Sequence, residues 1–233
     1  MLRRFLPIIL LAGLTAHAAV LPPYLKDALA HFNPEIPPDF AYTVTIRRAD
    51  ASSVERYDPS QPEDRQWTLL RRNNRPATAE ENFRYASYRT ANAPSARPTF
   101  RRGDIDLNSL RLIREDENRA EFLGRFRDDL NDPMLRKLEV RLTVSKQPAA
   151  IEQFVLQLTG VFSPVLTVKM LELRVVTILS PSVGGRPALP LHIISRFRGR
   201  VLLFKSVEED VQTTYSDFSR VVPHPPQSAA TPS

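Results

Sequence analysis

Residues 137–144 read KLEVRLTV, an alternation of charged or hydroxyl-bearing side chains with leucine and valine. Successive side chains of a β-strand point to opposite faces of its sheet, so this period of two predicts a strand with one buried and one solvated face. The same pattern occurs on either side, at 119–126 and at 154–158. Residues 105–215 are therefore predicted to be a nearly unbroken succession of half-buried strands.

Outside that region, residues 40–47 alternate in the same way and predict the first strand. Residues 165–179 change phase, because apolar side chains occupy even positions up to Met170 and odd positions from Leu171 onward. A change of phase within one long strand predicts a β-bulge, which favours curvature. Tight turns are predicted near Gly199 and at 208–210, and they divide residues 191–215 into three strands.

Two short helices are predicted. Pro22 and Pro23 precede apolar side chains at helical spacing between residues 24 and 32. Thr78 with Glu81 three residues later forms a capping box, which predicts a helix over 79–88 with Phe83 on its buried side. The predicted fold is mainly β: an antiparallel curved sheet, or unclosed half-barrel, of about nine to eleven strands with two or three short helices on its concave side.

The two ends of the chain differ from the middle. Arg3 and Arg4, an apolar run over 5–14 and an Ala-His-Ala sequence at 16–18 have the layout of a secretory signal peptide. The apolar run is shorter than the roughly 20 residues that cross a bilayer, so no transmembrane segment is expected after cleavage. The predicted organisation is a signal peptide over 1–18, one β-domain over 19–222 and a disordered tail over 223–233.

The chain contains no cysteine, which excludes disulfides, thiolate metal sites and thiol nucleophiles. An exported, cysteine-free domain of this size suits the bacterial periplasm. Removal of the signal peptide lowers the formal net charge from +6 to +4, and acidic residues interleave with the arginines. A nucleic acid is therefore not expected as a partner.

No motif in the chain specifies a reaction. His31, His192 and His224 are isolated, without the spacing of a zinc-binding helix, and no G-x-S-x-G elbow accompanies them. The glycines form neither a phosphate loop nor a dinucleotide fingerprint, so no catalytic residue, metal or cofactor is predicted. Arginines flank two turns, at 71–75 and at 196–200, which leaves an anion site at a rim as an open alternative.

The shortage of helix suggests what the apolar face does. Two short helices cover only part of so wide a sheet, so the remaining apolar face must close on itself or meet a ligand. The candidates for lining an apolar cavity, with ordinary core packing as the alternative for each, are Phe40, Tyr42, Trp67, Phe122, Phe126, Phe154, Leu156 and Leu158.

Residues 57–70 (YDPSQPEDRQWTLL) and 74–81 (NRPATAEE) resemble the early part of uncharacterised proteobacterial exported proteins. Residues 199–205 (GRVLLFK) through 215–218 (YSDF) resemble the end of the same proteins. Those proteins are in turn similar to the periplasmic lipoprotein-sorting carriers of the LolA/LolB-like superfamily. The resemblance implies an unclosed antiparallel β-barrel, covered by helices, whose apolar cavity shelters acyl chains. It also implies an arginine that holds the lid closed from within the cavity.

Two functions follow as hypotheses. The first is a non-enzymatic periplasmic binding protein that holds an acyl chain, a lipid or a lipidated protein in an apolar cavity. The alternative is a structural or interaction module of the cell envelope, which has an envelope protein as its partner, a core filled by its own side chains and no lipid ligand.

Overall fold

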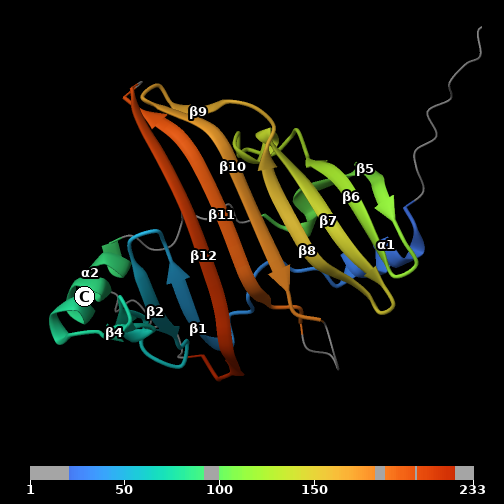
Figure 1. Ribbon diagram of the computed structural model, residues 1–233. Coiled ribbons are helices and arrows are strands. Elements are labelled where there is room, and N and C mark those ends of the chain that lie inside the picture. Colours follow the sequence, from blue (N-terminus) through green and yellow to red (C-terminus); the bar gives the residue numbers. More distant parts are fainter. Residues whose placement is uncertain (1–20, 92–99, 182–186, 203, 224–233) are drawn as a thin grey trace, which may run out of the picture.

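The computed structural model describes residues 21–91, 100–181, 187–202 and 204–223. The predicted signal peptide and residues 224–233 of the predicted tail lie outside these ranges. Within them, the chain forms one antiparallel sheet and two α-helices, α1 and α2 (Figure 1). The sheet is strongly twisted, and its strands follow one another along the chain with few long connections.

Twelve strands make up the sheet, in the spatial order β4-β3-β2-β1-β12-β11-β10-β8-β7-β6-β5, with β9 paired to β10. Their bounds are β1 Phe40–Arg47, β2 Ser52–Tyr57, β3 Trp67–Arg72, β4 Arg75–Pro76, β5 Ile105–Glu115, β6 Arg119–Phe126, β7 Leu138–Lys146, β8 Ala149–Leu158, β9 Phe162–Val165, β10 Val168–Leu179, β11 Pro190–Val201 and β12 Lys205–Arg220. The edge strands β4 and β5 do not pair with each other, so the sheet is unclosed.

The predicted fold class is confirmed: the described chain is mainly β, antiparallel and unclosed. The strand count exceeds the predicted range by one because the sheet includes two very short strands, β4 with two residues and β9 with four. Neither is long enough for an alternation of side chains to identify it in a sequence.

Helix α1 spans Pro23–Ala30 and packs on β7 and β8. Its apolar side, with Leu25, Leu29 and the following Phe32, is buried in the main hydrophobic core, as the helical spacing predicts. Tyr24 donates a hydrogen bond of 2.8 Å to Glu115 at the end of β5. Burial, together with that hydrogen bond, raises the pKa of Tyr24 to about 12. The helix is therefore held to the sheet by apolar packing and by one polar contact at its start.

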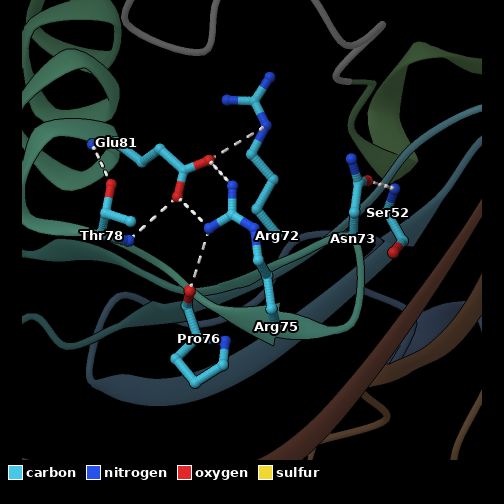
Figure 2. Close-up of polar contacts among 7 residues, drawn as sticks. All are labelled: Ser52, Arg72, Asn73, Arg75, Pro76, Thr78 and Glu81. Carbon is cyan, nitrogen blue, oxygen red and sulfur yellow. Dashed lines mark hydrogen bonds and ion pairs between the residues drawn. The ribbon is translucent and has the colours of Figure 1, made fainter.

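Helix α2 spans Ala79–Ala91, three residues beyond the predicted end. The predicted capping box is present: the Glu81 amide donates to the Thr78 hydroxyl at 3.2 Å, and the Thr78 amide donates to the Glu81 carboxylate at 3.0 Å (Figure 2). The prediction for Phe83 is wrong, because this side chain is 75% exposed. The helix instead turns Asn82, Tyr85 and Arg89 toward the sheet, so its inward side is polar and aromatic.

The change of phase predicted within 165–179 is confirmed in β10. Its pairing with β11 shifts between Met170 and Glu172, and Leu171 at the shift is 42% exposed. One extra residue in β10 at this point restores the apolar side chains of the following stretch to the same face. Both halves of the strand therefore contribute to one core.

Two predicted turns are wrong. Strand β11 continues through Gly199 to Val201, and β12 runs unbroken from Lys205 to Arg220. A Cβ atom at Gly199 would lie 2.8 Å from the backbone oxygen of Lys169 on the neighbouring strand, so this glycine permits close packing within the sheet. Two of the acidic residues at 208–210 lie in β12 opposite arginines of β11 and form cross-strand ion pairs, Glu208 with Arg198 and Asp210 with Arg196. Glu209 lies opposite Phe197 and pairs with Arg48.

Candidate functional site

Both helices lie on the same face of the sheet, which we call the inner face. One row of directly paired residues crosses this face from β6 to β1 and shows how its burial changes. The row runs through Phe122, Leu142, Phe154, Thr177, Ile193, Thr213 and Ile46. It is buried from β6 to β10, and its two isoleucines on β11 and β1 are partly exposed. The inner face is therefore mostly apolar along this row, with Thr177 and Thr213 as its polar members, and it is unevenly covered.

Five of the predicted cavity residues lie together in the section of the inner face beneath α1. Phe100 contributes to this section as well, since its ring lies 5.2 Å from Phe126 and 5.4 Å from Phe154, centroid to centroid. The five side chains are between 2% and 9% exposed. They are Phe122, Phe126, Phe154, Leu156 and Leu158. The structure places them in a packed core made of the protein's own side chains.

The other three predicted cavity residues lie at the opposite end of the face. Tyr42 and Trp67 are partly exposed and belong to an aromatic cluster on β1, β2, β3 and β12. Ring centroids in it are separated by 5.0 to 6.5 Å. Its members are Tyr42, Tyr57, Trp67, Tyr215 and Phe218. Phe40 is buried at the start of β1, with the Arg220 guanidinium 5.4 Å from its ring. The eight predicted residues therefore form two separate groups.

Helix α2 is joined to the sheet by a buried polar network that the sequence analysis missed. The Glu55 carboxylate on β2 accepts hydrogen bonds from Arg89 at 2.6 Å, from Tyr85 at 2.7 Å and from Ser53 at 2.8 Å. Its side chain is only 7% exposed, and that of Arg89 is 21% exposed. We call these four residues the Glu55 network. A glutamate at an inward position of a strand, with Tyr and Arg four residues apart on a helix, is the signal that could have revealed it.

The electrostatics of the Glu55 network favour one protonation state. Burial, with the nearby Glu55 carboxylate, raises the pKa of Tyr85 well above its usual range, so its hydroxyl stays a donor at any physiological pH. Arg89 also donates to the Tyr85 hydroxyl oxygen at 2.9 Å and stacks 4.1 Å above the Trp67 ring. One guanidinium thus connects the helix to both the buried carboxylate and the aromatic cluster.

The middle of the inner face lies between these two covered sections. Helix α1 packs mainly on β7 and β8, and α2 packs mainly on β3, whereas β10, β11 and β12 lie between them (Figure 1). Five apolar side chains of this region are partly exposed. We call them the central strip: Ile46, Val175, Ile193, Phe197 and Val211. Val175 and Phe197 contact the main core from its edge. The strip is therefore an apolar continuation of the core.

Four of the six arginines at 71–75 and 196–200 are engaged by carboxylates. Glu81 binds Arg75 through two hydrogen bonds of 2.7 and 2.8 Å and lies 4.0 Å from Arg72 (Figure 2). Arg75 lowers the pKa of Glu81 from 4.5 to about 2. In β11, Arg196 pairs with Asp210, and Arg198 with acidic residues of both neighbouring strands. These contacts occupy most of the cations that could have formed the alternative anion site.

The two described histidines make polar contacts with a backbone oxygen and with a hydroxyl group. His31 Nδ1 lies 3.0 Å from the backbone oxygen of Asp27, and His192 Nδ1 lies 3.2 Å from the Thr214 hydroxyl. His224 lies outside the described residues. Across the ranges that the structure describes, no three His, Asp or Glu side chains are grouped closely enough to hold a metal ion, and no helix has the length and hydropathy to cross a membrane.

Three surface depressions lie at the β5–β7 end of the sheet. The largest, of about 660 Å³, is lined by Arg102, Asp106 and Arg127 among others, and the other two are lined mainly by charged and amide side chains. None of the three is lined by a predicted cavity residue or by the central strip. The two smaller depressions have open, mainly polar walls, which differ from a site for an apolar ligand, whereas the largest is also lined by Ile105 and Leu107.

Comparison with known proteins gives one structural likeness. No protein-family model matches the chain, and no curated protein is significantly similar to it in sequence. The chain is similar to the crystal structure of a LolA superfamily protein, NE2245 from Nitrosomonas europaea, at 14% sequence identity and a TM-score of 0.37. The match covers 87% of this chain and 93% of the other. The superfamily in the name of that protein is the one to which the sequence pointed as a resemblance.

Proposed function

We propose that this protein is a non-enzymatic binding protein of the periplasm that holds an acyl chain, free or carried by a lipid or lipidated protein. The observation that carries the proposal is the central strip. It offers partly exposed apolar side chains on four adjacent strands, between two sections of the same face that helices cover. An extended chain lying across these strands would gain ~0.8 kcal/mol for each CH₂ removed from water.

The proposal assigns different parts to the predicted cavity residues. Tyr42 and Trp67 are partly exposed and would contact the ligand at the α2 end of the strip. The five residues beneath α1 would form the packed wall at its other end. Arg89 would take the part of the arginine that the LolA/LolB-like resemblance implies, since it ties the covering helix to the sheet. In this protein that arginine would lie on the helix itself, and Glu55 would be its acceptor.

Periplasmic location is part of the same proposal. It is supported by the signal-like layout of residues 1–18, by the absence of cysteine and by the resemblance in residues 57–81 and 199–218. Under this proposal the single β-domain over 19–222 is the exported protein, and the ligand is bound without chemical conversion.

The proposal is tested by uptake of a fluorescent fatty-acid analogue into delipidated protein. Ile193 and Ile194 provide a matched pair, because they are neighbours on β11 whose side chains point to opposite faces, and Ile194 is 47% exposed. Ile193→Asn should weaken uptake by about tenfold, since it places an amide in the path of the chain. Ile194→Asn should leave uptake unchanged. Failure of the unmodified protein to take up the probe would refute acyl binding.

A second candidate function is favoured by a different observation. Five of the eight predicted cavity residues are packed against α1 and Phe100, as expected of a sheet whose core is filled by its own side chains. Such a protein would be an interaction module of the cell envelope. Native mass spectrometry of freshly purified protein separates the two: a co-purifying lipid supports binding of acyl chains, whereas a stoichiometric envelope protein without lipid supports the module.

A further inference from the structure

Four strands of the sheet end at one point. Strand β9 turns into β10 through residues 166–167, and β11 ends at Val201 shortly before β12 begins at Lys205. The two connections lie side by side, since the Leu202 amide donates a hydrogen bond of 2.7 Å to the Thr167 carbonyl oxygen. Figure 1 shows these ends together at the top of the molecule, where the β11–β12 hairpin extends past β1 and β2.

Large apolar side chains gather at this point and face solvent. Leu166 is 97% exposed, Phe204 is 83% exposed, and Val165 and Leu202 are both more than half exposed. We call these four residues the tip. Leu202 has a positive φ of 53°, which a glycine or asparagine would adopt at lower cost. Single exposed apolar residues are common on protein surfaces, but four in and beside two adjoining turns form a patch of the kind that binds a partner.

Basic residues surround the tip without acidic neighbours. Residues 160–171 and 199–207 contain Lys169, Arg200 and Lys205 but no aspartate or glutamate. All three cations are exposed, and none forms an ion pair within the described part of the chain. The nearest carboxylates along the strands, Glu172 and Glu208, are both engaged by Arg198.

The arrangement of these cations indicates an anionic partner. Lys169 and Arg200 are directly opposite each other on adjacent strands, a like-charge pair that is unfavourable unless an anion lies between them. Lys205 pairs with Val201 and therefore points to the other face of the sheet. Positive charge thus flanks the tip on both faces, while the apolar side chains project beyond it.

We propose that the tip docks on an anionic phospholipid bilayer. The side chains of Leu166, Leu202 and Phe204 would enter the interfacial region, and the three cations would contact phosphate groups of the lipid headgroups. The pattern fits a lipid surface better than a protein groove, because the apolar groups project from the narrow end of the sheet and the charge surrounds them. This inference is independent of the central strip and goes beyond acyl-chain binding.

The experiment measures binding to phosphatidylcholine vesicles with and without phosphatidylglycerol, by flotation. We expect the unmodified protein to bind the anionic vesicles and to be released by salt. Leu166→Ser/Phe204→Ser should weaken this binding by about tenfold or more, since it removes the inserting groups. Lys169→Gln/Arg200→Gln should weaken it by about fivefold for each cation removed.

The matched control is Phe83→Ser/Ile113→Ser, which removes two exposed apolar side chains far from the tip. All chains compared carry the same N-terminus, so the apolar run at 5–14 contributes equally to each. Circular dichroism and uptake of the fatty-acid probe verify that the tip variants are folded, and they separate failure of this inference from failure of the proposed function. Equal vesicle binding by the tip variant and the unmodified protein would overturn the inference, as would tip-dependent binding to a protein in the absence of any binding to vesicles.

Discussion

Replacing Glu55 with alanine should loosen α2 from the sheet. The substitution removes the acceptor of three hydrogen bonds, two of which come from the helix, and it leaves the Arg89 guanidinium next to an apolar side chain. Removing one member of a buried ion pair typically costs 3–5 kcal/mol, but Arg89 is 21% exposed and water recovers part of that loss. We expect Glu55→Ala to lower the free energy that holds α2 on the sheet by about 3 kcal/mol.

Two measurements distinguish local release of α2 from global unfolding. Urea denaturation reports the free energy of unfolding of the whole sheet, and hydrogen exchange of the amides in 79–91 reports opening of the helix alone. Because α2 lies at one end of the sheet, we expect the free energy of opening of α2, from hydrogen exchange, to fall more than the free energy of unfolding of the sheet, from urea denaturation. The double variant Glu55→Ala/Arg89→Ala should be less destabilised than the sum of the single variants, since the two side chains share one interaction.

The matched control is Asp210→Ala, which breaks the exposed pair between Asp210 and Arg196. Their side chains are 56% and 50% exposed, so this change should cost less than about 1 kcal/mol. If Glu55→Ala costs no more than Asp210→Ala and leaves exchange of the α2 amides unchanged, the Glu55 network does not hold the helix, and the reasoning from its burial is refuted.

Three further outcomes are expected. Leu29→Ala shortens a side chain of α1 that is only 1% exposed and should lower the free energy of unfolding by about 2–5 kcal/mol in urea denaturation. A loss below about 1 kcal/mol would contradict the packing of α1. Gly199→Ala should cost about 1–3 kcal/mol in the same assay, because its Cβ would clash with the Lys169 backbone, whereas a tight turn there would tolerate it. The pKa of Glu81 is lowered from 4.5 to about 2, so its contribution to stability is complete above pH 4.5 and is lost as the pH falls toward 2. Ellipticity of Glu81→Gln and of the unmodified protein, followed from about pH 6 to about pH 2, should therefore converge at the acid end; a constant difference would count against the contact with Arg75.

Alternation of side chains predicted most of the strands because it reports a property of each strand by itself. The first strand at 40–47, the strand at 138–144 and the bulge near Leu171 all follow from which side chains can be buried together on one face. The capping box of α2 was predictable for the same reason, since its two hydrogen bonds join residues only three positions apart. Local chemistry was sufficient for these features.

The wrong predictions share a different cause. Phe83 has the hydropathy of a core residue, yet the side of α2 that meets the sheet is selected by Glu55, which lies about thirty residues away along the chain. Gly199 and the acidic residues at 208–210 look like turns, but their roles depend on the strands beside them, which supply a close backbone in one case and arginines in the other. Neither partner can be identified from the local sequence.

The sequence by itself determined that this protein is a broad antiparallel sheet with an apolar face, because a period of two is imposed by backbone geometry and by burial alone. Only the tertiary structure decided how that face is used. Which section lies under α1, which is joined to α2 by a buried carboxylate, and which remains partly open depend on pairing between residues far apart in the chain. The same physics places the exposed tip, since four strand ends meet there only once the sheet has formed.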